Sequence, residues 1–299
     1  MFKAVNSDII HSQNQKDKSN LKFEYEHLQI KLDKKNINID QIKDKLKNFQ
    51  VALPTWGVGT GGTRFARFPG IGEPQNIFEK IEDCAVINDL VGITKYVSPH
   101  FPWDNVTDFK ELKEFANNYN IGFDVVNSNT FQDHLKNNLS FKYGSLTNSQ
   151  QLIRDKAIKV NLEAIESGKI LGSKGITVWI GDGGNFPGQV SFSNSLDRYI
   201  DSMKKIYSSL PDDWFVYLEH KPYEPAFYST VISDWGTSYI CAKELGDKAM
   251  CLVDLGHHLP NTNIEMVVSR LIDAKKLGGF HFNDSKFGDD DLDSGSINP

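Results

Sequence analysis

Two carboxylates and an imidazole lie at the ends of three successive apolar segments of the sequence. Glu219 follows residues 215–218, Asp254 lies in 250–255, and His281 lies in 279–283. If these segments are neighbouring parallel strands of a barrel, their side chains converge at one end of it. Carboxylates with an imidazole suit a first-row divalent cation, and the oxygen-rich set favours Mn²⁺ or Mg²⁺. Each residue alone is more typical of a buried hydrogen-bonded group, but three in succession predict a metal site.

An acidic run follows the segment that carries His281. Residues 287–293 read FGDDDLD, and short runs of this kind are most often solvated loops. This run, however, lies at the end of the barrel where the other ligands are expected, and His257 comes three residues after Asp254. Carboxylates crowded there without a cation would repel one another strongly. We therefore expect a second cation, with Glu219 bridging the two.

Seven short apolar segments alternate with helical patterns, and these elements must position the ligands. The segments are 51–56, 93–98, 122–126, 176–180, 215–218, 250–255 and 279–283. The clearest helical pattern covers 262–277, with Thr262 and Glu265 as a capping box and Gly278 as the C-cap. Such alternation predicts a parallel sheet, either doubly wound or closed into a barrel. Because polar residues follow nearly every segment, and only a barrel gathers those ends around one axis, we predict an α/β fold of the (β/α)₈ TIM-barrel type.

The predicted domain organisation has two parts. Residues 1–49 are rich in Lys, Asn and Asp, and Ile39, Ile42, Leu46 and Phe49 have nearly helical spacing, so we predict an N-terminal helical extension. Residues 50–299 are predicted to form the catalytic barrel. Seven strands do not close an eight-stranded barrel, and the chain stops after an acidic loop. We therefore expect the last strand and the flanking helices to be missing.

Composition and charge restrict the partners and the compartment. Hydrophobic residues make up 39% of the chain and charged residues 24%, with no apolar run near the ~20 residues of a membrane span, so we expect a soluble protein without a membrane partner. No secretory signal is present, which favours the cytoplasm. Three dispersed cysteines, Cys84, Cys241 and Cys251, are predicted to be buried thiols. The net charge of -6, with scattered basic residues, gives little reason to expect nucleic-acid binding.

Three strings match one known family in order and spacing. They are EHKPYEP at 219–225, VDLGHH at 253–258 and GFHFNDSK at 279–286. They resemble the L-rhamnose isomerase family of the xylose-isomerase-like barrels, in the bacterial branch with relaxed aldose specificity, over most of the chain from about Trp56 to Ser296. The resemblance implies an aldose–ketose isomerase that interconverts L-rhamnose and L-rhamnulose, with other aldoses as further candidate substrates. It also implies a homotetramer.

The resemblance further assigns the cations. It implies a structural cation held by Glu219, Asp254 and His281, and a catalytic cation held by Glu219, His257, Asp289 and Asp291. Two Mn²⁺ ions are expected, with Mg²⁺, Co²⁺ or Zn²⁺ as alternatives. The family's fourth ligand to the structural cation is an aspartate at the end of the eighth strand, beyond the end of this sequence. Cations that chelate both hydroxyls would stabilise the charge that develops while hydrogen moves between C1 and C2, by a hydride shift or an enediol.

Four residues are candidate catalytic groups. By resemblance, His100 would open the pyranose ring, although a lone histidine at a strand end is more often structural. Lys221 would bring positive charge to O1, or would equally well balance the carboxylates. Asp289 and Asp291 would flank a metal-bound water that moves the hydroxyl proton if a hydride shifts.

Aromatic residues near the strand ends are candidate substrate-binding groups. They are Trp56, Trp103, Phe131 and Trp179, and Lys221 is added to them for its charge. Aromatic side chains of a barrel usually belong to its core, but flat apolar walls also bind the C–H faces of sugars. We favour the pocket over the core for Trp103 and Trp179.

Two alternatives remain open at this point. A metal-dependent hydrolase or endonuclease on the same barrel would use similar ligands, but it would need a basic surface facing DNA, which this acidic chain does not indicate. The second alternative is an inactive truncated remnant that binds a sugar or a metal. Nicking of abasic DNA would favour the first, and restored activity in a longer chain would favour the second.

Overall fold

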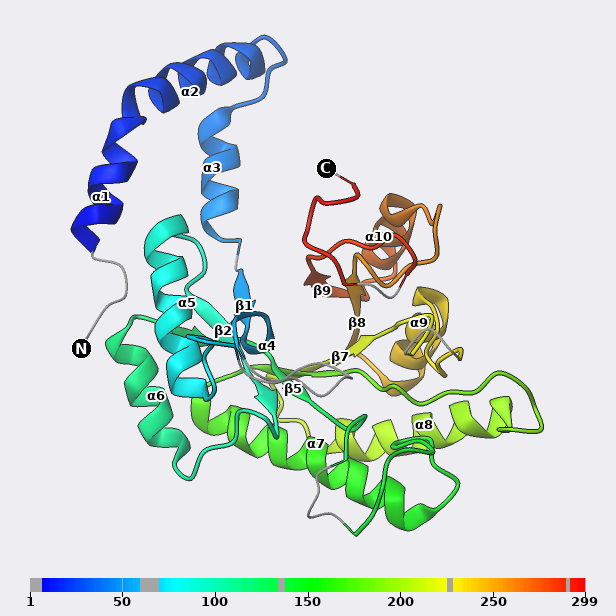
Figure 1. Cartoon of the computed structure of the whole chain (residues 1–299). Helices are drawn as coiled ribbons and strands as arrows, with labels where there is room; N and C mark the ends of the chain where they lie inside the picture. The colour runs from blue at the N-terminus through cyan, green and yellow to red at the C-terminus, as the bar shows by residue number, and fades with distance from the viewer. Residues whose placement is uncertain are drawn as a thin grey trace.

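A series of parallel strands with helices around its outside makes up most of the protein (Figure 1). The computed structural model describes residues 7–49, 51–59, 70–133, 138–224, 228–288 and 291–298. The strands are β1 (Ala52–Pro54), β2 (Tyr96–Ser98), β3 (His100–Phe101), β4 (Gly122–Phe123), β5 (Val126–Ser128), β6 (Gly175–Val178), β7 (Phe215–Glu219), β8 (Ala249–Asp254) and β9 (Leu277–His281). The helices are α1 (Ser7–Lys16), α2 (Lys18–Asp33), α3 (Ile39–Lys47), α4 (Thr55–Val58), α5 (Ile77–Val91), α6 (Phe109–Asn118), α7 (Gln151–Leu171), α8 (Phe192–Ser208), α9 (Trp235–Leu245) and α10 (Ile264–Asp273).

The strands follow one another in chain order. One sheet has the order β1-β2-β4 and the other β3-β5-β6-β7-β8-β9, and every pair is parallel. β2 and β3 are two halves of one strand position, interrupted at Pro99, and β4 and β5 are likewise interrupted at residues 124–125. Proline cannot donate a ladder hydrogen bond, which explains the first break. The result is seven strand positions, at the seven segments predicted from the sequence.

This strand order distinguishes a barrel from a doubly wound sheet. A doubly wound sheet reverses its strand order at a switch point, and no reversal occurs among the described strands. The α/β barrel prediction is therefore confirmed. Within the described residues β1 and β9 are the two ends of the series, and aromatic contacts join them: the rings of Trp56 and His281 lie 6.2 Å apart, and those of Phe49 and Phe282 lie 6.3 Å apart.

Apolar side chains from the strands and helices fill a continuous core. Val97, Ile176, Val216 and Leu218 are fully buried, as expected for strands covered by crossover helices. The three cysteines are free and buried, as predicted, and burial raises the pKa of Cys84 to about 12. Among the helices of the described ranges, none combines the length and the apolarity of a membrane-spanning segment.

The ends of α10 differ from the sequence prediction. The helix begins at Ile264 rather than near Thr262, because the side chain of Asn263 accepts a hydrogen bond from the backbone N–H of Met266 at 2.8 Å. Asparagine is among the best N-cap residues, which explains why it displaces the predicted capping box. Gly278 is not a C-cap but part of β9, where a Cβ would lie 2.5 Å from the ring of Tyr217.

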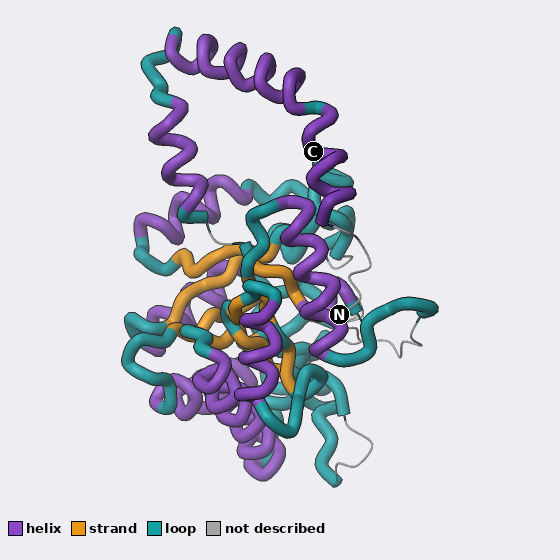
Figure 2. The backbone as a smooth tube through the Cα atoms, turned by 90° about the vertical axis from the view of Figure 1, so that its left-hand side faces the viewer, coloured by secondary structure: helices purple, strands orange, loops and turns teal. Residues whose placement is uncertain are grey.

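Residues 7–49 form an arm of three helices that projects beyond the strands (Figures 1 and 2). The spacing of Ile39, Ile42 and Leu46 predicted α3, but α1 and α2 have no comparable sequence signal. α1 contacts α5 through the buried Ile10, whereas α2 buries none of its residues. The arm therefore returns to the barrel at α3, immediately before β1.

Candidate functional site

Three strand ends bring Glu219, Asp254 and His281 together as predicted. In the parallel register Asp254 pairs with His281, and Glu219 pairs with Leu252 on the strand between them. His281 Nδ1 lies 3.3 Å from Glu219 Oε1 and 3.4 Å from Asp254 Oδ2. Both carboxylates are buried, with Glu219 7% and Asp254 3% exposed. The side chains thus form a compact cluster that is largely shielded from solvent.

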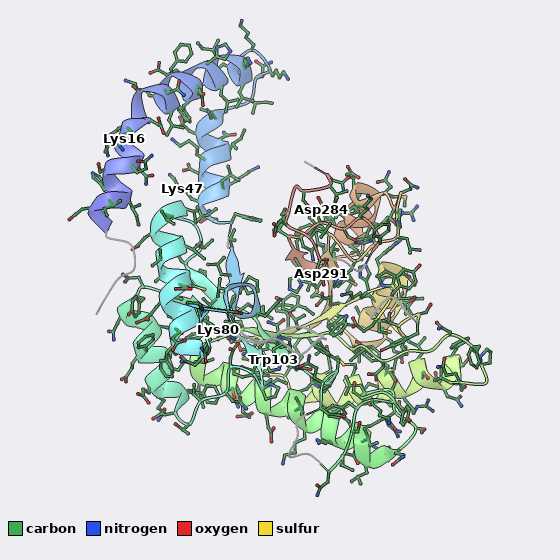
Figure 3. All side chains as sticks on the ribbon, in the orientation of Figure 1. Lys16, Lys47, Lys80, Trp103, Asp284 and Asp291 are labelled. Atoms are coloured by element: carbon green, nitrogen blue, oxygen red, sulfur yellow. The ribbon has the colours of Figure 1, made fainter. Side chains whose placement is uncertain are left out.

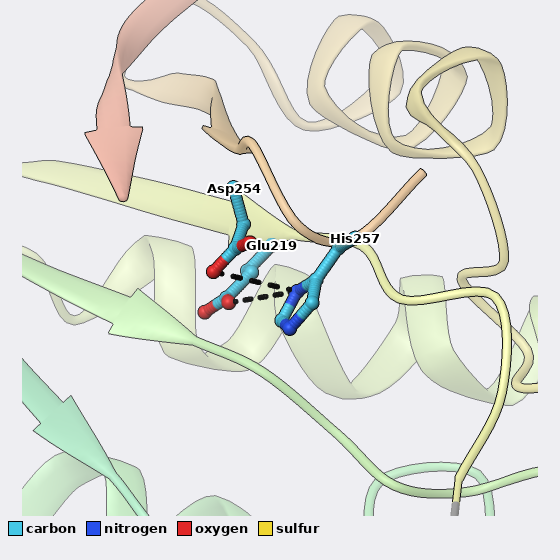
Figure 4. Close-up of side chains that lie close together, drawn as sticks. All are labelled: Glu219, Asp254 and His257. Carbon is cyan, nitrogen blue, oxygen red and sulfur yellow. Dashed lines mark ion pairs between the residues drawn. The ribbon is translucent and has the colours of Figure 1, made fainter. Parts of the chain in front are cut away.

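His257 joins this cluster from the turn after β8 (Figure 4). Its Nδ1 lies 3.2 Å from Glu219 Oε1 and 3.6 Å from Asp254 Oδ2. Ligand atoms of Glu219, Asp254 and His257 all lie within 4.8 Å of one another, which is the geometry of a candidate metal site. Two carboxylate oxygens and an imidazole nitrogen match the ligand preference of Mn²⁺ and related first-row cations.

Asp291, which lies on the C-terminal loop and is labelled in Figure 3, contacts the ring nitrogen of His257 that does not face Glu219. Its Oδ1 lies 2.8 Å from His257 Nε2, and its Oδ2 accepts a hydrogen bond from Lys221 Nζ at 3.1 Å. The backbone of Asp291 has φ of 42°, a left-handed conformation that aspartate tolerates better than most residues. Asp289, the other predicted ligand of this loop, lies outside the described residues.

Opposing charges set the protonation of the cluster. Burial acts to lower the pKa of His257, but Asp254, Asp291 and Glu219 outweigh it and raise the pKa to about 10. Burial likewise acts to lower the pKa of His281, but Glu219 and Asp254 outweigh this effect and raise that pKa to about 10. Burial acts to raise the pKa of Glu219, yet the two imidazolium rings hold that pKa well below its usual range. The Glu219 carboxylate therefore stays ionised, and any bound cation must displace protons from the two histidines.

This competition predicts a pH dependence. After chelation, His257 and His281 have folded-state pKa values of about 10 against 6.5 for the free side chain. Their contribution to stability is complete below pH 6.5 and is lost as the pH rises towards 10. The chelated protein should thus melt at lower temperature from pH 7 to 9, while Mn²⁺ affinity rises by roughly tenfold per pH unit for each displaced proton. Calorimetry with and without Mn²⁺ measures both trends, and a Mn²⁺ affinity that is flat over this range would contradict them.

Sequence reasoning missed Asn283, which supports the ligands from the end of β9. Its Nδ2 donates to Asp254 Oδ2 at 3.1 Å and to Asp291 Oδ1 at 3.3 Å, while its Oδ1 accepts from the backbone of Gly256 at 2.6 Å. A Cβ at Gly256 would lie 2.8 Å from that amide oxygen. The Asn283 amide therefore links both carboxylate groups to the turn that carries His257. Its position directly after a strand was the signal available in the sequence.

The predicted substrate-binding aromatics form one continuous wall beside the cluster. Ring centroids lie 5.1 Å apart for Trp56 and His100, 4.2 Å for His100 and Trp103, 5.8 Å for Trp103 and Phe131, and 4.7 Å for Phe131 and Trp179. Lys221 Nζ lies 5.7 Å from the Trp179 ring, so the wall ends at the lysine that contacts Asp291. The structure thus brings together every predicted site residue that it describes.

Several polar atoms in this wall are buried without a partner among the described residues. They are His100 Nδ1, Asn129 Nδ2 and Trp179 Nε1. Burial lowers the pKa of His100 to about 4, against a smaller opposite effect of Asp104, so the ring is neutral at pH 7. Buried polar groups are normally hydrogen-bonded, so these atoms have hydrogen-bonding capacity that the described residues do not use.

Comparisons with known proteins agree with this geometry. No family model matches the chain. A protein of Mesorhizobium japonicum named "probable sugar isomerase" is 59% identical over 295 residues, which cover 99% of this chain and 68% of that protein. A second protein of the same name from Rhizobium meliloti is 57% identical over 299 residues, covering 100% of this chain and 70% of that protein.

Solved structures with a similar fold include sugar epimerases. The E. coli 3-keto-D-glucoside 4-epimerase matches with a TM-score of 0.55 and 17% identity, over 76% of this chain and 78% of that chain. The Clostridium cellulolyticum D-psicose 3-epimerase matches with a TM-score of 0.57 and 13% identity, over 79% of this chain and 73% of that chain. These likenesses place the chain in the class of TIM-barrel folds, in agreement with its parallel strand order. Within that class, the chain belongs to the family of the two probable sugar isomerases.

The resemblance to L-rhamnose isomerases was wrong as a family assignment. The relatives carry the broader name of sugar isomerase, and the structural neighbours are epimerases of other sugars. The three strings that supported the narrower family are those around Glu219, Asp254 and His281. These strings carry the strand-end cluster of Glu219, Asp254, His257 and His281, which the name of sugar isomerase fits as well as the narrower family name.

Proposed function

We propose that this enzyme is a divalent-metal-dependent aldose–ketose isomerase that moves hydrogen between C1 and C2 of its substrate. The observation that carries the proposal is the buried group of Glu219, Asp254 and His257 with ligand atoms within 4.8 Å, placed next to an aromatic wall. The relatives named as sugar isomerases support the reaction type.

The side chains present fit divalent cations. Glu219 Oε1 contacts both His257 and His281, so Glu219 would help to hold both ions, one of them with Asp254 and His281 and the other with His257 and Asp291. We propose two Mn²⁺ ions, for which Mg²⁺, Co²⁺ or Zn²⁺ are substitutes. A bound cation would polarise the oxygens on C1 and C2 and stabilise the negative charge that develops there.

Residues of the chain itself orient the substrate and move its protons. The wall from Trp56 to Trp179 would hold the apolar face of the sugar, and the unpaired His100 Nδ1 and Trp179 Nε1 would bond its hydroxyls. Asp291, hydrogen-bonded to Lys221, is positioned to exchange the hydroxyl proton, and Lys221 would bring positive charge to the oxygen on C1. Neutral His100 is the candidate for opening the sugar ring.

The substrate is proposed to be an aldose, and L-rhamnose, L-mannose and D-allose are unranked candidates. The test incubates each ¹³C1-labelled aldose with the protein and Mn²⁺ and identifies the product by NMR. We expect a ketose with the label retained at C1. Epimerised sugar without any ketose, or nicking of abasic DNA without sugar conversion, would replace the isomerase assignment with an epimerase or an endonuclease.

We also propose that the protein forms a homo-oligomer through the N-terminal arm. Residues 1–49 carry 10 lysines and 7 acidic residues, a net charge of +3, whereas the whole chain has a net charge of -6. α2 leaves Leu21, Phe23 and Ile30 more than half exposed. A basic, apolar arm complements the acidic body of a second copy. Sedimentation velocity should therefore show an oligomer that Phe23→Lys with Ile30→Lys dissociates, and a monomeric wild-type chain would contradict this.

A further inference from the structure

A buried ion pair lies behind the aromatic wall, outside the candidate metal site. Lys80 on α5, labelled in Figure 3, places Nζ 2.8 Å from Asp104 Oδ1, and the two side chains are 2% and 0% exposed. Replacing a buried ion pair with apolar side chains is often neutral or stabilising, so such a pair is weak evidence for a role in stability. The position of the Lys80–Asp104 pair in the fold is therefore a better guide to its role than a contribution to stability.

Asp104 connects three segments that carry the first half of the wall. Its Oδ2 accepts hydrogen bonds from Thr55 Oγ1 at 2.5 Å and from the backbone N–H of His100 at 2.8 Å. The backbone N–H of Asp104 in turn donates to the His100 carbonyl at 3.0 Å, which closes the turn that carries Trp103. Thr55 immediately precedes Trp56. The Asp104 carboxylate thus links the backbone of His100 to the hydroxyl of Thr55, the neighbour of Trp56, while the Asp104 backbone closes the turn that carries Trp103.

Lys80 also lies directly under the segment that follows β1. A Cβ at Gly59 would lie 3.0 Å from Lys80 Cγ and 2.6 Å from the carbonyl oxygen of Pro74. The chain therefore passes over the lysine stem in close contact, and α4, with Thr55 fully buried, is held between Lys80 and Asp104. The ion pair, the Thr55 hydroxyl and the His100 turn form a single unit.

We propose that Asp104, Lys80 and Thr55 are positioning residues that set the orientation of Trp56, His100 and Trp103 relative to the metal cluster, and thereby the pose of the sugar. The proposal rests on the proposed isomerase function for its catalytic consequence. None of the three positioning residues needs to contact the substrate. Trp56 links the unit to the cluster, because its ring lies 6.2 Å from that of the ligand His281. A small displacement of the unit would therefore move the wall relative to the reacting carbons.

Thr55 offers the mildest test, because valine has the same shape without the hydroxyl. Thr55→Val should lower kcat/KM on the order of 10-fold or more, mostly in kcat, while Mn²⁺ affinity changes less than about 2-fold. Thr55→Ser keeps the hydrogen bond to Asp104 and should retain kcat/KM within about 2-fold of wild type. The double variant Lys80→Met/Asp104→Asn removes both charges together and provides a second test should Thr55→Val fail to fold.

A matched control separates positioning from simple destabilisation. Lys276 is a buried lysine just before β9, at the opposite end of the barrel, where its Nζ donates to the carbonyls of Gly246 and Ala249 at 2.7 and 2.9 Å. Lys276→Met should lower the melting temperature yet keep kcat/KM within about 2-fold at a temperature where it is folded. If Thr55→Val and the double variant also keep kcat/KM within that limit, the positioning role is wrong and the unit is merely structural.

A measurement that needs no substrate tests the positioning role independently of the proposed isomerase function. The chain has 5 tryptophans, so ¹⁹F NMR of protein labelled with 5-fluorotryptophan gives a small set of signals that single Trp→Phe variants can assign. Thr55→Val should shift the signals of Trp56 and Trp103 but not that of the core residue Trp214, and Thr55→Ser and Lys276→Met should shift none. If the wild type converts no sugar, the isomerase function fails while these signals still decide the positioning role. Unmoved Trp56 and Trp103 signals in Thr55→Val overturn it.

Discussion

Replacing Glu219 with glutamine should reduce sugar interconversion by about 10³-fold or more, the largest effect expected from any single substitution. The carboxylate contacts both His257 and His281, at 3.2 and 3.3 Å, and lies closer to each ring than Asp254, the other carboxylate of the described cluster that approaches both. Glutamine has nearly the same shape as glutamate but carries no negative charge, so it cannot hold two cations as the carboxylate would. We expect Mn²⁺ affinity, measured by titration calorimetry, to fall together with kcat.

Asp254 also approaches both rings, at 3.6 and 3.4 Å, but in the proposed division of ligands it binds on the His281 side alone. The matched control for Glu219→Gln is therefore Glu224→Gln, the same change at a buried residue of the following segment, 3.7 Å from Lys221. This control should cost less than about 10-fold in kcat, because Glu224 is not one of the proposed cation ligands. A Glu219→Gln enzyme with more than a tenth of wild-type kcat and unchanged Mn²⁺ affinity would refute the bridging role.

Replacing Lys221 with methionine should lower kcat by about 10²-fold while leaving Mn²⁺ affinity within about 3-fold. The ammonium group is 5% exposed and lies 3.1 Å from Asp291 Oδ2. If Lys221 stabilises charge on the sugar oxygen, its removal lowers kcat and changes Mn²⁺ affinity little. If it only balances carboxylates, its loss changes metal binding instead, because Lys221 and His257 together lower the pKa of Asp291 to about 2, against the effect of burial.

Steady-state kinetics and calorimetry on the same preparation distinguish these two roles of Lys221. Lys286→Met, a change at an exposed lysine just after β9, is the control and should alter neither quantity. A Lys221→Met enzyme with weaker Mn²⁺ binding and an unchanged kcat at saturating Mn²⁺ would assign the lysine to charge balance.

The strand positions and the metal cluster were accessible from the sequence for one physical reason. In a parallel barrel each strand ends at the same face, so a polar residue after an apolar run has a predictable place even when the exact strand boundary is not known. Glu219, Asp254 and His281 could therefore be grouped without coordinates. The order of strands, which decides between a barrel and a doubly wound sheet, could be inferred only from the chemistry at their ends.

Other features depend on contacts between distant parts of the chain. Asp104 meets Thr55 and Lys80, which lie 49 and 24 residues away, and nothing in the local pattern of any of the three residues indicates this contact. Asn283 was visible as a strand-end residue, but its bonds to Asp254 and Asp291 depend on the path of the C-terminal loop. The family assignment failed although its three strings lie in the candidate cation cluster, because the curated relatives carry the broader name of sugar isomerase.

Metal dependence of the wild-type enzyme is the most direct test of the isomerase assignment. The protein should be assayed for aldose-to-ketose conversion as purified, after exhaustive chelation with removal of the chelator, and after Mn²⁺ is added back. We expect conversion to be lost on chelation and restored by Mn²⁺ in proportion to occupancy of the two cation sites proposed for Glu219, Asp254, His257, His281 and Asp291. Conversion that continues unchanged in thoroughly chelated protein would contradict the metal-dependent mechanism.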